Sequence, residues 1–141
     1  MKLSTKGRYG VTAMYDLALQ FGNGYTPLNS IAQRQMISEP YLEQLIAPLR
    51  KAGLVRSVRG PHGGYILAKL PSEITIGDII RILEGPIAPV ECVEDDNEFC
   101  GKMESCITRD IWVQLRDSME KVLDSITLAD LVKSPKGINI A

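Results

Sequence analysis

The fold of this chain is decided by residues 28–67, LNSIAQRQMISEPYLEQLIAPLRKAGLVRSVRGPHGGYIL. In the first part of this stretch, apolar residues recur at spacings of three and four, which predicts two short helices joined by a tight turn. The second part alternates apolar and basic residues around the glycine-rich segment RGPHGG, which predicts a β-hairpin. The stretch therefore predicts helix, turn, helix and hairpin in that order.

The two helices are expected over residues 28–36 and 39–52. Ser38 is a good N-cap for the second helix, and Gly53 stands where that helix should end. Pro48 removes one backbone hydrogen bond and should bend the helix near its middle. The side chains expected to face the core are Ile31, Ala32 and Met36 in the first helix and Leu42, Leu45, Ile46 and Leu49 in the second.

The face of the second helix that lies off its apolar stripe carries Glu43 and Gln44. Glutamine can bond adenine through two hydrogen bonds and glutamate can accept one from cytosine, so the pair suits base reading. Both are also ordinary surface residues of a helix, but the turn before them and the basic hairpin after them favour the reading role. Together these elements predict a winged helix-turn-helix, which places one helix in the major groove of DNA. The residues expected to contact DNA are Ser38, Tyr41, Glu43, Gln44, Arg50, Arg56 and Arg59.

The hairpin, or wing, is expected over residues 54–68, with Arg59 at its tip. Flanking glycines let the backbone approach another surface, and an arginine there suits a narrow minor groove. Arg56 is expected to contact a phosphate. His62 is the single histidine and is expected to be a polar loop residue, ahead of phosphate contact or metal ligation.

Further helices are expected on both sides of this stretch. Residues 6–21 predict one helix, and Thr75 with Asp78 forms the capping box of another. Thr127 should cap a short final helix. The expected core residues are Val11, Met14, Tyr15, Ala18 and Phe21 in the first helix and Ile76, Ile79, Ile80 and Leu83 after Thr75.

Residues 106–125 predict a long amphipathic helix that Ser105 can cap. It carries two apolar stripes, which is more than one small domain needs to cover, so we infer a homodimer in which the helix packs against its symmetry mate. The alternative is a helix folded back on its own domain. The stripe expected at the dimer interface contains Ile107, Ile111, Leu115, Val122 and Ile126, and the second contains Trp112, Met119 and Leu123.

Composition and charge limit the possible functions. The chain has 141 residues, 45% hydrophobic and 23% charged, as expected for one globular domain with a small appendage. Residues 1–69 carry nine Lys/Arg and three Asp/Glu, and residues 70–141 carry seven and fourteen, so the halves have net charges of +6 and −7. A basic half of this kind suits a polyanion. No apolar run reaches the roughly 18 residues of a membrane span, and the N-terminus lacks the apolar core of a signal peptide. We therefore expect a cytoplasmic protein, and no motif indicates an enzyme.

Three cysteines, Cys92, Cys100 and Cys106, lie within one acidic segment. An odd number without a secretion signal argues against a disulfide framework. This leaves metal binding, redox chemistry or incidental thiols. A zinc site on the three cysteines is one form of such metal binding, but the C-x-x-C spacing common in zinc sites is absent.

Several segments of the chain resemble the IscR family of bacterial winged-helix transcription regulators, whose members include the iron–sulfur cluster regulator IscR and the cysteine-metabolism regulator CymR. The segments are MKLSTKGRYGVTAM, SIAQ, ISEPYLEQLIAPLRKAGLV, RGPHGGY and ITIGDIIRILEG. The resemblance implies a homodimer on pseudo-palindromic promoter DNA, with residues 39–52 in the major groove and Arg59 in the minor groove. Glu43 matches a glutamate that tunes sequence preference, and Gln44 matches a position that contacts bases or backbone.

The three cysteines match the IscR branch, which implies a 2Fe–2S cluster held by three cysteines and a histidine three residues after the last. Here that position holds Arg109, which cannot ligate iron. Candidates for the fourth ligand are Asp110, Glu104, an N-terminal residue of the partner chain or an exogenous group.

The sequence thus predicts a mostly α-helical protein: a winged helix-turn-helix domain over 1–84, a linker and cysteine-bearing loop over 85–105, and a dimerisation helix with a short C-terminal helix over 106–141. The expected function is repression of iron–sulfur cluster biogenesis genes on double-stranded promoter DNA, controlled by a 2Fe–2S cluster. The alternative is a cluster-free winged-helix regulator that senses thiol redox state or cysteine metabolism.

Overall fold

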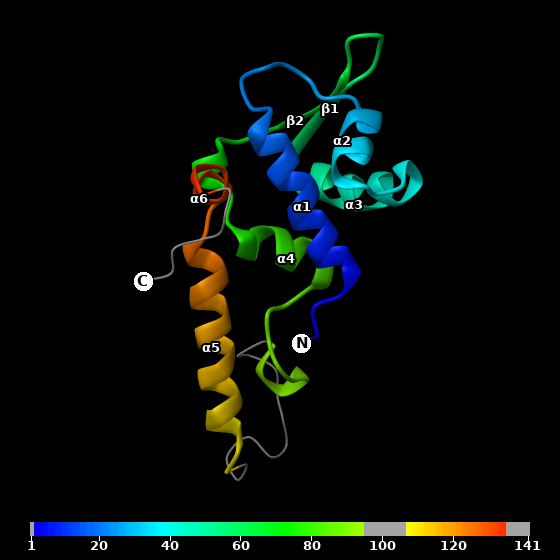
Figure 1. The fold of residues 1–141 in the computed structure, drawn as a ribbon. Coiled ribbons are helices and arrows are strands. Elements are labelled where there is room, and N and C mark those ends of the chain that lie inside the picture. Colours follow the sequence, from blue (N-terminus) through cyan, green and yellow to red (C-terminus); the bar gives the residue numbers. More distant parts are fainter. Residues whose placement is uncertain (1, 95–106, 135–141) are drawn as a thin grey trace.

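The computed structural model describes residues 2–94 and 107–134, which form a helical body with a two-stranded antiparallel sheet (Figure 1). The predicted mostly α-helical, winged fold is therefore confirmed. The elements are α1 (Thr5–Leu19), α2 (Leu28–Gln35), α3 (Glu39–Lys51), β1 (Val55–Val58), β2 (Gly64–Leu67), α4 (Ile76–Glu84), α5 (Arg109–Ser125) and α6 (Leu128–Lys133), with short 3-10 turns η1 (Pro71–Glu73) and η2 (Glu91–Val93).

The helix-turn-helix pair forms where the sequence predicts it. Ser38 caps α3 by accepting from the backbone N–H of Tyr41, and all four residues of the predicted apolar stripe of α3 are buried. In α2 the prediction for Met36 is wrong. This residue is the C-cap in the left-handed conformation, with φ 56°, and its side chain is 91% exposed. The helix has already ended there, so the apolar spacing no longer points inward.

Helix α1 crosses the body and packs on α4 through its glycines. Gly7 and Gly10 are buried, and a Cβ on Gly10 would overlap the Leu83 side chain. The predicted inward direction of Phe21 is wrong, because α1 ends at Leu19 and Phe21 is exposed in the turn that follows. Close approach of α1 and α4 thus depends on the absence of side chains, which hydrophobic spacing does not reveal.

The wing is an antiparallel hairpin in which Val55 pairs with Leu67 and Val58 with Gly64. Thr26 extends it, because its N–H and C=O each bond to Tyr65 at 2.8 Å. A Cβ on Gly64, whose φ is +145°, would overlap the backbone of Thr26. The wing is therefore fixed to the loop before α2.

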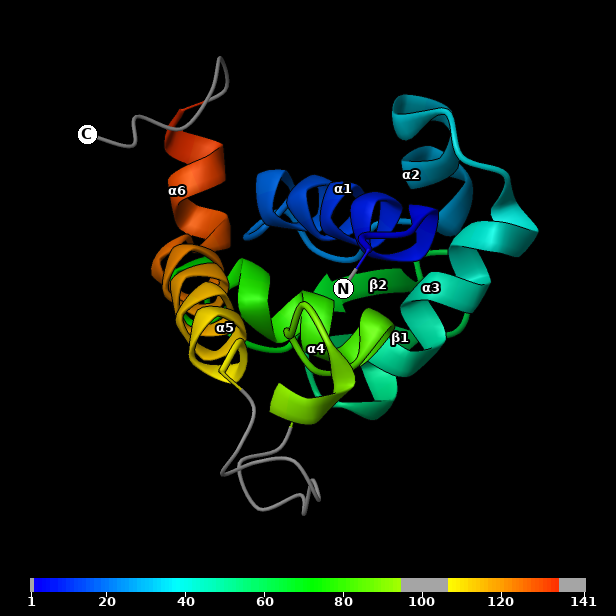
Figure 2. The same cartoon turned by 90° about the horizontal axis from the view of Figure 1, so that it is seen from below.

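One core lies where α1, α3, α4 and α6 meet. The predicted residues of α4 are buried, and the capping boxes of Thr75 with Asp78 and of Thr127 with Asp130 are both present. Leu128 of α6 is fully buried in this core. Figure 2 shows α5 and α6 along one side of the body, with α2 and α3 on the opposite side.

Helix α5 begins at Arg109, with Thr108 at its N-cap position, so the prediction of Ser105 as the cap is wrong; Ser105 itself lies outside the described residues. The two predicted stripes of this helix have different surroundings. Met119 and Leu123 of the second stripe pack against the core, whereas Ile107, Ile111, Leu115 and Val122 of the first are exposed, with Ile107 at 94%. The assignment of Ile126 to the exposed stripe is wrong, because α5 has ended at Ser125 and Ile126 packs against the core; Trp112 is half-buried. In Figure 1, α5 runs away from the hairpin, and η2 lies near its far end.

Candidate DNA interface and cysteine site

A groove of about 660 Å³ lies between α3 and the wing. Four of the residues predicted to contact DNA line it, two from the middle of α3, one from its end and one from the wing. They are Glu43, Gln44, Arg50 and Arg59. The structure therefore brings together residues that are up to 16 positions apart (59 minus 43) in the sequence.

The wing side of this groove carries the cations. Arg50 reaches across from α3, and its guanidinium donates to the Ser57 hydroxyl of β1 at 3.3 Å. Arg56 and Arg59 are exposed, and Arg59 follows directly after β1. Exposed guanidinium groups on a projecting hairpin suit contact with phosphates or a narrow groove. His62 is exposed in the turn between the strands.

Tyr41 lies on the other side of α3, at its contact with α1. Its hydroxyl donates to Thr5 Oγ1 at 3.1 Å, and its ring meets Tyr9 edge-on, with centroids 6.0 Å apart. Ser38 stands beside it at the start of α3. The contacts of these two residues with DNA stay predictions, and the geometry adds that Tyr41 links the N-terminal ends of α1 and α3.

Asp16 of α1 and Arg34 of α2 form a partly buried ion pair. The sequence hints at this pair only through the position of Asp16 among apolar residues. Asp16 is fully buried and accepts from Arg34 Nε at 2.9 Å, from Arg34 NH2 at 2.8 Å and from Gln35 Nε2 at 2.8 Å. The hydrogen bond from the guanidinium to Asp16 raises the pKa of Arg34. These contacts fix the first helix of the helix-turn-helix pair to α1.

The N-terminus of α1 is held by a carboxylate from the end of α4. Glu84 accepts from the Ser4 hydroxyl, from the Ser4 N–H at 3.1 Å and from the Gly7 N–H at 3.0 Å. The Ser4 hydroxyl bond lowers the pKa of Glu84. An anion at a helix N-terminus is favourable because the first N–H groups of a helix have no partners within it.

Cys92 is the one cysteine among the described residues, and it lies half-buried on η2. Cys100, Cys106 and Glu104 lie outside the described residues. Within residues 2–94 and 107–134, no three potential metal ligands form a group. Asp110 is exposed in the first turn of α5.

Arg109 opens α5. Its Nε is buried and has no hydrogen-bond partner in the part of the chain that the structure describes.

A second, apolar groove of about 630 Å³ lies beside α5. It is lined mainly by aliphatic side chains of α1, α4 and α5, among them Val11, Ile76, Ile80, Met119 and Val122. Val122 also belongs to the exposed stripe of α5, so the groove and the stripe meet at this residue. Across the described ranges, no helix combines the length and apolar character that a membrane crossing requires.

The known proteins similar to this chain in sequence include transcriptional regulators. The model of the Rrf2 family, described as "Iron-dependent Transcriptional regulator", matches residues 3–134. The chain is 54% identical to the HTH-type transcriptional regulator CymR of Bacillus subtilis (strain 168), over 97% of this chain and 94% of CymR. It is 44% identical to the HTH-type transcriptional regulator IscR of Pectobacterium atrosepticum, over 100% of this chain and 85% of that protein.

Among solved structures, T. potens IscR superposes with a TM-score of 0.78 at 52% identity, covering 100% of this chain and 93% of the other. The relative named CymR thus matches at 54% identity, and the two relatives named IscR match at 44% and 52%. The chain belongs to the Rrf2 family and is a DNA-binding transcriptional regulator, not an enzyme.

Proposed function

We propose that this regulator acts as a homodimer in the cytoplasm, represses iron–sulfur cluster biogenesis genes, and is controlled by a 2Fe–2S cluster held by Cys92, Cys100 and Cys106. The observation that carries the proposal is the position of η2. This turn bears Cys92 and packs against α5, the helix whose apolar stripe is exposed. A ligand bound at the turn would therefore act on the helix that we assign to dimer formation.

The DNA contacts follow from the groove between α3 and the wing. Gln44 on α3 would read a base, and Arg59 would enter the minor groove, with Arg56 on a phosphate. Replacing Gln44 by alanine should reduce discrimination between operator and altered operator by about 1–3 kcal/mol. Replacing Arg56 by alanine should weaken binding to all duplexes alike and reduce the salt slope by about one.

Fluorescence anisotropy with labelled promoter duplexes at several salt concentrations would measure both effects. Equal effects of the two substitutions on every duplex would contradict the assignment of Gln44 to base reading. The matched control is Lys69→Ala, which removes an exposed cation just after the wing.

The proposed dimer is supported by the exposed apolar stripe of α5 and by the groove that meets this stripe at Val122. Exposed aliphatic side chains in such a surface are usually covered by a partner, and a second copy of α5 offers the matching surface. Replacing Leu115 by glutamate should give a monomer that binds a full operator weakly. Gln114→Glu adds the same charge at an exposed neighbouring position and should leave the dimer intact. Sedimentation equilibrium separates these outcomes, and a Leu115→Glu variant that stays dimeric would contradict the assignment.

The donor set fits a 2Fe–2S cluster in its thiolates and leaves one ligand to be found. Iron–sulfur clusters take cysteine thiolates and, in some proteins, other ligands. Arg109 cannot ligate iron. Its buried Nε–H has no partner among the described residues and suits a negatively charged acceptor. We assign Arg109 to charge neutralisation. The fourth position would fall to Asp110, Glu104, a partner residue or an exogenous group.

When bound, the cluster would supply a group whose presence depends on iron and redox conditions. The chain's own residues would do the remaining work. The cysteines would hold the cluster, and η2 would hold one of them, Cys92, beside α5. Cys92→Ala should remove iron and visible absorption from anaerobically isolated protein while the fold is retained.

The second candidate is a cluster-free regulator that senses thiol oxidation or cysteine metabolism. It is favoured by the 54% identity with the relative named CymR and by the half-buried, free thiol of Cys92. Stoichiometric iron in the isolated protein would rule it out. Iron-free protein whose DNA affinity changes on oxidation of Cys92 would favour it.

A further inference from the structure

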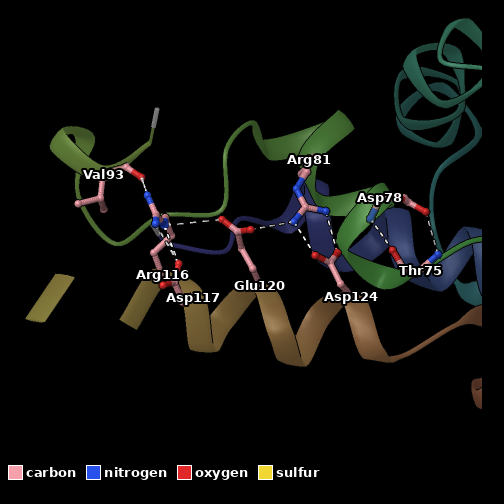
Figure 3. Close-up of polar contacts among 8 residues, drawn as sticks. All are labelled: Thr75, Asp78, Arg81, Val93, Arg116, Asp117, Glu120 and Asp124. Atoms are coloured by element: carbon pink, nitrogen blue, oxygen red, sulfur yellow. Dashed lines mark hydrogen bonds and ion pairs between the residues drawn. The ribbon is translucent and has the colours of Figure 1, made fainter. Parts of the chain in front are cut away.

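We infer, building on the proposed role of Cys92, that Arg116 is a positioning residue for this cysteine. Arg116 lies on α5, and its NH1 donates to the backbone carbonyl of Val93 at 3.0 Å (Figure 3). Val93 is the residue directly after Cys92. The Arg116 side chain is only 11% exposed. A guanidinium group from the helix therefore holds the turn that carries the thiol.

The turn itself has little internal support. It is a three-residue 3-10 turn without a side-chain cap, closed by two backbone bonds, from the Glu94 N–H to the Glu91 carbonyl at 3.1 Å and from the Val93 N–H to the Val90 carbonyl at 3.4 Å. Such short turns are weak on their own. Two contacts within the described residues join it to the rest of the protein. One is the fully buried Val93 side chain, and the other is the hydrogen bond from Arg116.

Acidic residues one and four positions further along α5 orient the guanidinium. Asp117 Oδ1 accepts from Arg116 Nε at 3.0 Å and from NH2 at 2.9 Å, and Glu120 lies 3.9 Å from Nε. Glu120 also lies 3.5 Å from Arg81 of α4 (Figure 3). The guanidinium donates to the carbonyl through NH1 and to Asp117 through Nε and NH2, and the single nitrogen of a lysine cannot reproduce this spacing, so lysine is a poor substitute.

The exposures of the partners show which contact matters most. Asp117 is mostly exposed, and Glu120 is partly exposed, so their ion pairs with Arg116 are weakened by water. The bond to Val93 is made by a nearly buried guanidinium to a backbone carbonyl and is screened less. Among these contacts, the bond to Val93 therefore contributes most, and it fixes η2, and hence Cys92, before any ligand arrives.

The test measures the reactivity of Cys92 in the full-length, reduced and chelator-treated chain, so it needs no cluster. Pulsed alkylation with iodoacetamide, followed by mass spectrometry of the Cys92 peptide, gives its rate. Arg116→Gln should react roughly tenfold faster than the unaltered chain, the factor that loss of one hydrogen bond to a charged group implies. Arg116→Lys should give most of the same acceleration.

Two controls separate a local effect from general weakening. Lys121→Gln removes an exposed cation from the same helix and should not change the rate. Leu123→Ala removes a side chain packed on the core and destabilises α5 without touching the turn. When the Leu123→Ala variant and the unaltered chain are compared under conditions that give them the same free energy of unfolding, their Cys92 alkylation rates should be similar.

An unchanged rate in Arg116→Gln, or an acceleration no larger than in Leu123→Ala at equal stability, would overturn the assignment of Arg116. Neither result depends on whether iron binds. Conversely, iron-free protein would contradict the proposed cluster while the alkylation rates still decide the role of Arg116.

Discussion

Replacing Arg34 by alanine should lower stability more than replacing its partner Asp16 by asparagine, because the two side chains are buried unequally. The Asp16 side chain is 0% exposed and that of Arg34 is 42% exposed. Without Arg34, the Gln35 amide is the one side-chain donor that the described residues still offer to the buried carboxylate. An uncompensated buried charge of this kind costs about 3–5 kcal/mol. We expect the lower end, because water can enter where Arg34 was exposed.

Replacing Asp16 by asparagine instead leaves the Arg34 guanidinium without its partner carboxylate, but still in contact with water. Asp16→Asn keeps the shape of the side chain, and the guanidinium of Arg34 can be solvated. The loss is then that of the charge-assisted hydrogen bonds, about 1–2 kcal/mol. The two substitutions should therefore differ by about 1–2 kcal/mol, which is the lower end of the first range, about 3 kcal/mol, minus the second range.

Equilibrium unfolding in urea, followed by far-UV circular dichroism, would measure both losses. Gln33→Ala on the exposed face of α2 is the matched control and should change the free energy of unfolding little. The double variant should lose less than the sum of the single losses, because the two groups share one interaction. Equal losses, or a larger loss from Asp16→Asn, would refute the reasoning from burial.

Three further outcomes follow from single contacts. Met36→Gly should raise the free energy of unfolding, measured in urea, by about 0.5–1 kcal/mol. Glycine removes the strain of the left-handed conformation at φ 56°, and its greater flexibility in the unfolded chain offsets part of this gain. A free energy of unfolding below that of the unaltered chain would contradict this reasoning. Gly10→Ala should lower the melting temperature, since the new methyl group overlaps Leu83 and overpacking costs about 1–3 kcal/mol; an unchanged value would show that α4 yields. The pKa of Glu84 is lower in the folded protein than in the unfolded chain, where it is about 4.3. The ionised Glu84 carboxylate therefore stabilises the fold above a pH of about 4.3, and this stabilisation is lost as the pH falls through the folded pKa. Glu84→Gln should therefore be less stable at pH 7 and show a smaller loss between pH 5 and 2 in pH-dependent urea unfolding, and a parallel profile would contradict it.

The elements with local signals were predictable from the sequence. Helix α3 follows from its apolar spacing and from Ser38, and both threonine capping boxes follow from short patterns. The hairpin follows from alternation around glycines. These signals act within a few residues, so they do not depend on the rest of the fold.

The errors occurred where a helix ended. Met36 and Phe21 continue the apolar spacing of α2 and α1, but each lies just beyond its helix, where the spacing no longer indicates direction. Similarly, the sequence shows two stripes on α5 but does not say which one its own domain covers. Met119 and Leu123 prove to be the covered pair.

The contacts that position the candidate sites were not predictable. Asp16 with Arg34, Glu84 with Ser4 and Arg116 with Val93 join residues 18 to 80 positions apart. No local pattern marks such pairs, because each depends on how two elements pack. The sequence thus identifies residues that suit DNA or metal and leaves open the residues that hold them in place.

The central claim, a DNA-binding dimer controlled by a 2Fe–2S cluster on three cysteines, is tested most directly by iron and sulfide analysis with absorption spectra of anaerobically isolated protein. We predict a coloured protein with iron and sulfide in equal amounts, and a colourless, folded Cys92→Ala variant. A folded, colourless and iron-free unaltered protein would contradict the account.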